Sequence, residues 1–226
     1  MREGGEIAIQ AGGAGLPGYL AAPVSAAGPG VLVIHEASGL DDFTRDVCDR
    51  LGRAGFAALA PDLYRGEIAE SHEASLRLAA GLAPEQVARD LEAAVAQLLG
   101  ERSVVGDGVA AVGFCMGGHL ALLAGALSSR VEAIVDFYGL GALPVDLAQL
   151  GGPVLGIFAG DDEFIASERV DALRGELEAA GVRAHLRVEP GVGHAFMNHT
   201  RPERFDAVAA AAGWDRMIAF LRAELA

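Results

Sequence analysis

The sequence predicts an α/β fold in which a mostly parallel central sheet carries helices on both faces. Short β-branched or apolar runs alternate with longer segments of helical period, which is the pattern of parallel strands joined by crossover helices. The 226 residues suit one compact domain, so we expect a single domain over 1–226. With 52% hydrophobic and 21% charged residues, the chain has enough apolar surface to build a large core.

The individual elements follow from this alternation. Two early runs, 6–10 and 19–22, predict an antiparallel edge hairpin, and the apolar run 31–35 predicts a buried strand. Pro61 ends a strand over 56–60, and Pro84 precedes a helix whose apolar residues recur at helical spacing. Further strands are predicted at 109–114, 133–137, 154–159 and 184–188, and helices at 41–54, 85–99, 117–127, 167–180 and 202–225. The least regular segment, 64–83, is expected to form a loop-rich excursion over the functional site.

Composition excludes several classes of partner. A net charge of −14 repels phosphate backbones and anionic lipids, so we expect no nucleic-acid partner. The N-terminus lacks the apolar run of a signal peptide, and no apolar stretch approaches the ~20 residues that span a bilayer. We therefore expect a cytoplasmic protein without membrane contact, as a monomer or small homo-oligomer.

Two cysteines, Cys48 and Cys115, are too few for a disulfide framework, and the histidines lack the spacing of a zinc site. We expect neither a metal nor a cofactor. Cys48 falls within the predicted helix 41–54 and is interpreted as a core residue.

The strongest local motif is GFCMGG at 113–118, between a predicted strand and a predicted helix. It matches the nucleophile elbow G-x-S-x-G with Cys115 in the place of serine. Flanking glycines permit the tight turn, and the helix N-terminus favours a thiolate. Glycine-rich strand-to-helix turns also occur in nucleotide-binding folds, and cysteine is a common buried residue, so the motif alone does not decide.

Later motifs supply the partners that a nucleophile needs, in the order nucleophile, acid, base. The strand at 154–159 is followed by Asp161 and Asp162, and the strand at 184–188 by His194 in a glycine-flanked loop. His194 is the candidate general base. Adjacent residues point different ways, so the residues alone leave open which aspartate faces His194.

An oxyanion formed by attack of Cys115 on a carbonyl group needs two hydrogen-bond donors. The backbone N–H of Met116 is the expected first donor. The second is expected from the loop after the strand at 31–35, where Ala37 is the candidate.

Taken together, five motifs resemble the dienelactone hydrolase (carboxymethylenebutenolidase) family over nearly the whole chain. They are HEASGL at 35–40, APDLY at 60–64, GFCMGG at 113–118, GDDEFI at 160–165 and GHAF at 193–196. The resemblance implies the α/β-hydrolase fold, hydrolysis of a small ester or lactone, and a triad of Cys115, Asp162 and His194. It also implies that Glu36 interacts with the cysteine and holds the thiol neutral until substrate displaces it, and like-charge repulsion is a sensible basis for that role.

The same likeness raises the question of the substrate. We expect Tyr64, Arg65, Phe164, Phe196 and Asn198 to contact it. Asn198 stands where the family carries an arginine for the substrate carboxylate, and a neutral amide cannot make that charge-assisted contact. Arg65, Arg77 and Arg201 are candidate replacements, although each is expected to be a solvated surface residue. We therefore expect a neutral or differently shaped ester or lactone in preference to dienelactone.

Other functions remain to be weighed. One is a broad carboxylesterase or thioesterase of the same fold, and another is a non-catalytic binding or redox-sensing protein that keeps the thiol. A binding module has no need of an acid and a histidine in catalytic order. A dehydrogenase is disfavoured because no G-x-G-x-x-G follows the first buried strand.

Overall fold

The computed structural model describes residues 4–11 and 14–226 and contains one eight-stranded sheet. The strand order is β1-β2-β4-β3-β5-β6-β7-β8. The strands are β1 (Gly5–Ala11), β2 (Ala14–Ala21), β3 (Gly28–Ile34), β4 (Ala57–Pro61), β5 (Val104–Phe114), β6 (Val131–Phe137), β7 (Val154–Ala159) and β8 (Ala184–Glu189). The predicted hairpin is present as β1 and β2, which pair antiparallel, and β2 also pairs antiparallel with β4. All other neighbours are parallel, which confirms the predicted α/β class.

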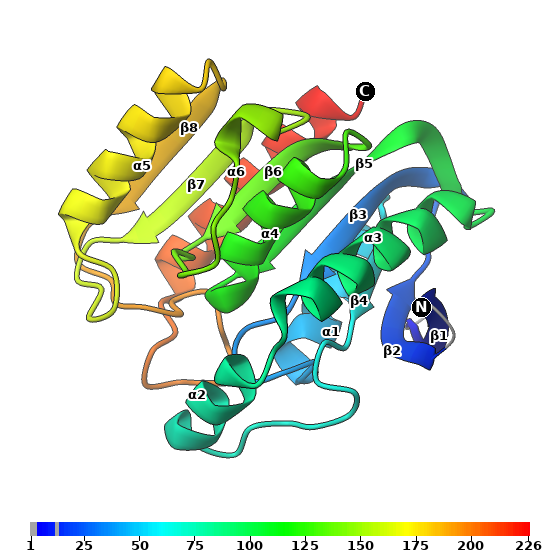
Figure 1. Ribbon diagram of the computed structural model, residues 1–226, viewed down its shortest axis with the longest axis horizontal. Coiled ribbons are helices and arrows are strands. Elements are labelled where there is room, and N and C mark those ends of the chain that lie inside the picture. The colour runs from blue at the N-terminus through cyan, green and yellow to red at the C-terminus, as the bar shows by residue number, and fades with distance from the viewer. Residues whose placement is uncertain (1–3, 12–13) are drawn as a thin grey trace.

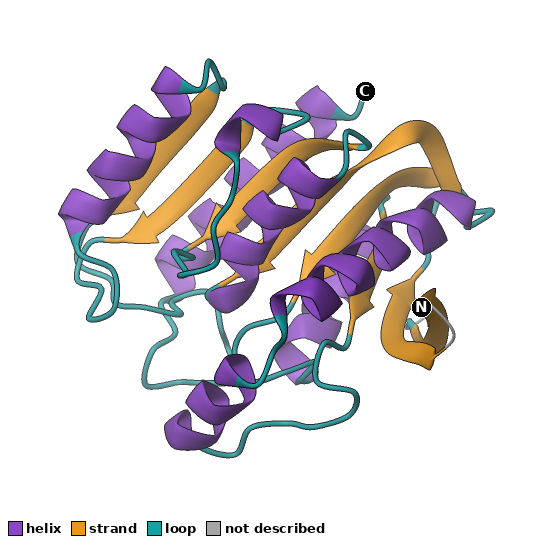
Figure 2. Cartoon of the chain, viewed as in Figure 1, coloured by secondary structure: helices purple, strands orange, loops and turns teal. Residues whose placement is uncertain are grey.

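Helices cover both faces of the sheet. They are α1 (Asp42–Arg53), α2 (His72–Ala80), α3 (Pro84–Gly100), α4 (Met116–Leu127), α5 (Ser167–Ala179) and α6 (Ala207–Glu224), with a short 3₁₀ helix at Leu147–Gln149. Helices α3, α4 and α5 lie on the face toward the viewer in Figure 1, and α1 and α6 lie behind the sheet. The same layering is visible in the secondary-structure colours of Figure 2.

Strand alternation creates a separate core on each face. In β3, Val31 and Val33 join the cluster that contains the buried residues of α1 and α6. Leu32 and Ile34 join the other cluster, with those of α3, α4 and α5. Because successive side chains of a strand point to opposite faces, one apolar run supplies both cores.

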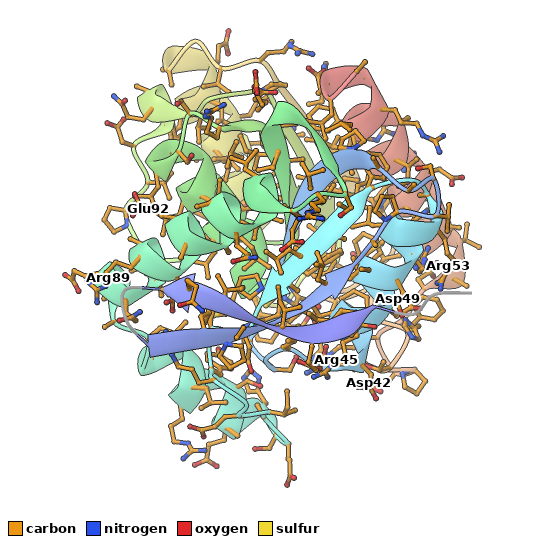
Figure 3. The ribbon with its side chains drawn as sticks, turned by 90° about the vertical axis from the view of Figure 1, so that its right-hand side faces the viewer. Asp42, Arg45, Asp49, Arg53, Arg89 and Glu92 are labelled. Carbon is orange, nitrogen blue, oxygen red and sulfur yellow. The ribbon has the colours of Figure 1, made fainter. Side chains whose placement is uncertain are left out.

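The edge of the sheet formed by β1 and β2 faces the viewer in Figure 3. Charged side chains flank it, with Asp42, Arg45, Asp49 and Arg53 of α1 on one side and Arg89 and Glu92 of α3 on the other. Charges around an edge discourage pairing with another chain. Within the described part of the chain, no helix is long and apolar enough to cross a membrane.

Several elements differ from the sequence-based expectation: β2 begins at Ala14 and not at 19, and β5 begins at Val104 and not at 109. The segment 64–83 contains helix α2, which begins after Ser71, whose side chain accepts a hydrogen bond from the N–H of Ala74. The last helix begins at Ala207 and not at 202, because Asp206 caps it by accepting from the N–H groups of Val208 and Ala209.

Candidate active site

The turn between β5 and α4 holds Cys115 in a strained backbone conformation. Its φ is 54° and its ψ is −120°, outside the regions that side-chain-bearing residues favour. The surrounding backbone approaches so closely that a Cβ on Gly113 would lie 1.8 Å from the carbonyl oxygen of Gly117. A Cβ on Gly117 would lie 2.2 Å from the carbonyl oxygen of Ile34. The two glycines are therefore required for the turn that presents Cys115 at the start of α4.

The loop after β7 places Asp162, and not Asp161, against His194. Nδ1 of His194 lies 2.8 Å from Oδ2 of Asp162. The other oxygen of Asp162 accepts from the backbone N–H groups of Phe164 and Ile165, at 2.8 and 3.0 Å. These bonds fix the carboxylate in place. Because the carboxylate accepts a hydrogen bond from Nδ1, a neutral His194 carries its proton on Nδ1, and Nε2 is the basic atom.

The surroundings of His194 favour its protonated form. Burial alone would lower its pKa, but the hydrogen bond that His194 donates to Asp162 and the proximity of Cys115 raise the pKa to about 10. Nε2 is buried and has no hydrogen-bond partner of good geometry among residues 4–11 and 14–226. The rings of Tyr138 and Phe164 each lie 5.0 Å from the imidazole, measured between centroids.

Glu36 lies buried beneath this site, just beyond the end of β3. Its carboxylate accepts from the hydroxyl of Tyr138 at 3.3 Å and from Nδ2 of Asn198 at 2.8 Å. Burial raises the pKa of Glu36, although the hydrogen bond from Asn198 opposes this. Among the residues described, these two groups are its side-chain partners, whereas the resemblance implied a direct interaction with the cysteine.

The loop that carries Glu36 and Ala37 is held by His35. The N–H of Leu63 donates to Nε2 of His35 at 3.2 Å, so Nδ1 carries the ring proton and donates to the carbonyl oxygen of Glu36 at 2.6 Å. Burial lowers the pKa of His35, which keeps the ring neutral. The N–H of Ala37 makes no hydrogen bond within the described ranges, and that of Met116, at the first position of α4, has no helical partner.

These groups converge on one cavity of about 850 Å³. Its wall includes Glu36, Ala37, Cys115, Met116, Phe164 and His194. Asp162 does not line the cavity itself but accepts a hydrogen bond from His194, which does. The structure thus brings together all of the residues predicted as nucleophile, base, acid and oxyanion donors.

Most of the residues expected to contact substrate lie elsewhere, and Phe164 is the exception. Arg65 is drawn away by an ion pair of 2.7 Å with the buried Asp90 of α3. Asn198 is fully buried, and Thr200 holds its amide in the orientation that faces Glu36. Asn198 therefore does not line the cavity, and its amide binds the carboxylate of Glu36.

The two other expected contacts are also corrected. Tyr64 packs against His35 and donates its hydroxyl to the sulfur of Met116 at 3.4 Å, behind the cavity wall. Phe196 is fully buried against the ring of Tyr138. Neither Tyr64 nor Phe196 lines the cavity, whereas Met116 and Tyr138, which they contact, do.

Sequence reasoning missed two features of the wall. Tyr138 follows directly after β6 at the edge of the sheet where the other functional residues gather, and that position was the available signal. Arg204 also lines the cavity and forms an ion pair with Glu163, a contact that nothing in the local sequence indicates. Of the three arginines proposed as contacts for a substrate carboxylate, Arg201 lines the cavity.

No group of three potential metal-ligating His, Cys, Asp or Glu side chains occurs in the described portion of the chain.

Comparison with known proteins identifies the family. The model of the dienelactone hydrolase family matches residues 16–225. The chain belongs to this family. A Yersinia pestis protein named "putative carboxymethylenebutenolidase" is 34% identical over 231 residues, which cover 95% of this chain and 86% of that protein.

Solved structures agree with the assignment. A Klebsiella pneumoniae structure described as a "putative dienelactone hydrolase" superposes with a TM-score of 0.88 at 29% identity, covering 97% of this chain and 98% of that one. A dienelactone hydrolase-like promiscuous phosphotriesterase from metagenomic libraries has a TM-score of 0.85 at 26% identity, covering 99% and 98%. The chain is therefore a hydrolase of the dienelactone hydrolase family with the α/β-hydrolase fold.

Proposed function

We propose that this hydrolase cleaves a small ester or lactone by acyl transfer to Cys115, with His194 as acid and base and Asp162 orienting the imidazole. The observation that carries the proposal is the 2.8 Å hydrogen bond between His194 and Asp162 beside a cysteine held at a strained elbow. A nucleophile, a base and a group that orients the base are the parts that covalent catalysis requires.

The reactive form of the site is proposed to contain a thiolate and an imidazolium. The raised pKa of His194, about 10, keeps the ring protonated at neutral pH next to Cys115. An adjacent cation and a helix N-terminus both stabilise a thiolate, which is the reactive form of cysteine. The cation is also a proton donor placed where a leaving group will need one.

Acylation begins when the thiolate sulfur attacks the carbonyl carbon and the new C–S bond pushes the carbonyl electrons onto oxygen. The N–H groups of Met116 and Ala37 are the proposed donors to this oxyanion. As the tetrahedral intermediate collapses, the C–O bond to the alcohol breaks and His194 gives its proton to the leaving oxygen. The products of this half-reaction are a thioester on Cys115 and an alcohol.

Deacylation reverses these roles. Neutral His194 takes a proton from water, the oxygen attacks the thioester carbon, and the C–S bond breaks to release the acid and restore the thiolate. With a lactone the alcohol stays attached to the acyl chain, so the product is a single hydroxy acid.

Glu36 is proposed to tune the thiol before substrate binds. Its carboxylate lines the same cavity as Cys115, and a second negative charge there opposes a thiolate. Tyr138 and Asn198 hold it in place. A Glu36→Gln substitution is compatible with this packing, because the amide can accept from Asn198 and donate to Tyr138.

The experiment that tests the proposal compares the two cysteines. Cys115→Ala should lower kcat/KM for p-nitrophenyl acetate by roughly 10³-fold or more, because the nucleophile is lost. Cys48→Ala is the matched control, because Cys48 is fully buried in α1 and burial raises the pKa of its thiol. The substitution should leave kcat/KM within about threefold of the wild-type value. Equal activity of Cys115→Ala and wild type would refute the proposal.

A further inference from the structure

The main cavity extends well beyond Cys115 along an apolar wall. This wall is formed by α2 and the residue that follows it, by α4, and by the loop after β6: Leu76, Ala79, Leu82, Leu120, Leu140 and Leu143. Helix α2 stands apart from the two helical layers, below the ends of the strands in Figure 1. Helix α2 therefore closes one side of the cavity, whereas the other helices cover the faces of the sheet.

Three polar residues of α2 and α4 line the cavity: His72, which stacks on Phe164 at the start of α2, and Ser75 and His119, whose polar atoms are turned away from the wall. The hydroxyl of Ser75 donates to the carbonyl oxygen of Ser71 at 3.1 Å. Nε2 of His119 lies 2.7 Å from the carbonyl oxygen of Leu143, and Nδ1 is buried. Burial lowers the pKa of His119, so the ring is neutral. The surface that Ser75 and His119 offer to a ligand is therefore largely hydrocarbon.

The wall is too large and too exposed to serve a two-carbon acyl group. A cavity of about 850 Å³ is at the upper end of the range that buries drug-sized ligands. Leu76 is 57% exposed and Phe164 is 53% exposed, although both line the cavity. Apolar surface gathered at a concave site is favourably covered by an apolar ligand.

The catalytic geometry decides which part of an ester meets this wall. His194 must protonate the leaving oxygen, so the alcohol lies on the side of His194. A second cavity of about 520 Å³ adjoins the first near the start of α2 and shares five lining residues with it: Ser38, His72, Phe164, Arg201 and Arg204. The acyl chain then extends away from His194, past Met116 and Leu120 of α4 toward the C-terminal end of α2.

We infer that the cavity between α2 and α4 is an acyl pocket, and that the preferred substrates are esters or lactones with a medium-length apolar acyl chain. This inference rests on the acyl transfer proposed above and names the substrate class for it. The acyl chain remains in this pocket in the thioester, while the alcohol leaves on the side of His194.

The test varies each half of the ester separately. Hydrolysis is followed by titration of released acid for the methyl esters of acetic, butyric, hexanoic and octanoic acids, and for the acetates of methanol, butanol, hexanol and octanol. Burial of a methylene corresponds to a factor of up to about four. We expect kcat/KM to rise roughly fiftyfold or more from methyl acetate to methyl octanoate, and less than about fivefold along the alcohol series.

Substitutions on α2 locate the effect. Ala79→Phe fills the pocket and should reduce the octanoate-to-acetate ratio of kcat/KM at least tenfold. Ala74→Phe is the matched control, because Ala74 is a partly buried alanine of the same helix that does not line the cavity. It should leave the ratio within about twofold. Thermal unfolding and circular dichroism verify that both variants are folded.

Binding of linear alkanamides, from acetamide to octanamide, to Cys115→Ala separates this inference from the proposed function. A dissociation constant that falls steeply with chain length, and less steeply when Ala79→Phe is added, supports the pocket even if no ester is hydrolysed. Three results would overturn the inference while leaving the chemistry of Cys115 intact. The first is an active enzyme whose kcat/KM does not change along the acyl series. The others are a kcat/KM that rises only along the alcohol series, and a dissociation constant for the amides that does not depend on chain length.

Discussion

At the residue scale, the choice between the adjacent aspartates shows what local sequence does and does not determine. The residues alone left Asp161 and Asp162 open, and the family resemblance favoured Asp162. In the structure, Asp162 turns inward because the N–H groups of Phe164 and Ile165 bind its carboxylate, while the exposed Asp161 contributes its backbone N–H to the carbonyl oxygen of Val192. An inward turn of this kind is set by the following two residues, which periodicity does not describe.

These neighbours give a matched pair of variants. Asp162→Asn should lower kcat/KM for p-nitrophenyl acetate by roughly 10²–10⁴-fold, because His194 loses the acceptor that fixes its tautomer and supports its charge. Asp161→Asn should leave the value within about threefold. Steady-state kinetics on the two proteins decide the point, and equal losses in both would contradict the assigned role of Asp162.

Other residue roles depend on partners far away in the sequence. Arg65 was a candidate for the substrate carboxylate until the fold placed Asp90 beside it. Asn198 was considered for its position after His194, whereas Glu36, 162 residues away, is what binds its amide. Such pairings follow from tertiary structure and carry no signal in local composition.

At the scale of elements, the β5–α4 elbow was predictable because its glycines have a steric cause. Gly113 and Gly117 lie where a side chain would collide with backbone. Helix α2 was not predicted as a separate element, and several of its apolar residues, among them Leu76 and Ala79, line the cavity. The last helix was predicted to start too early, at 202, because the cap that starts it, Asp206, acts through local hydrogen bonds that periodicity does not describe.

Two glycine variants test the steric account of the elbow. Gly113→Ala should reduce the free energy of unfolding by at least about 2 kcal/mol, because the nearest atoms to the new Cβ are backbone and cannot move aside. Gly175→Ala, in the interior of α5 with no heavy atom within 4 Å of the new Cβ, should increase it by roughly 0.5–1 kcal/mol. Urea denaturation measures both, and a neutral Gly113→Ala would show that the elbow tolerates a side chain.

At the scale of the whole molecule, the alternation of strands and helices was enough to predict the parallel sheet and its class. It could not place the hairpin beside β4 or set the strand order, because those depend on which edges meet. The net charge of −14 is another property of the whole chain, and it opposes the approach of an anionic substrate. Arg201 and Arg204 lie at the cavity, but Glu163 is paired with Arg204 and Glu36 lines the same space.

Charge therefore predicts a preference for neutral substrates. At low ionic strength, kcat/KM for neutral p-nitrophenyl esters should exceed that for dienelactone, which carries a carboxylate. Added salt should narrow the gap, because it screens the repulsion. The comparison is made at two salt concentrations with the same enzyme preparation. Faster turnover of dienelactone than of the neutral esters at low salt would show that local arginines dominate the cleft.

The central claim is that Cys115 carries the acyl group, and intact-protein mass spectrometry after rapid acid quench of the reaction with p-nitrophenyl acetate tests it most directly. We predict a mass gain of one acetyl group in the first turnover, removable by hydroxylamine, mapped to the peptide that contains residues 113–118, and absent from Cys115→Ala. An acetyl adduct that persists in Cys115→Ala, or ester turnover by the wild type with no adduct at Cys115 at any quench time, would contradict the account.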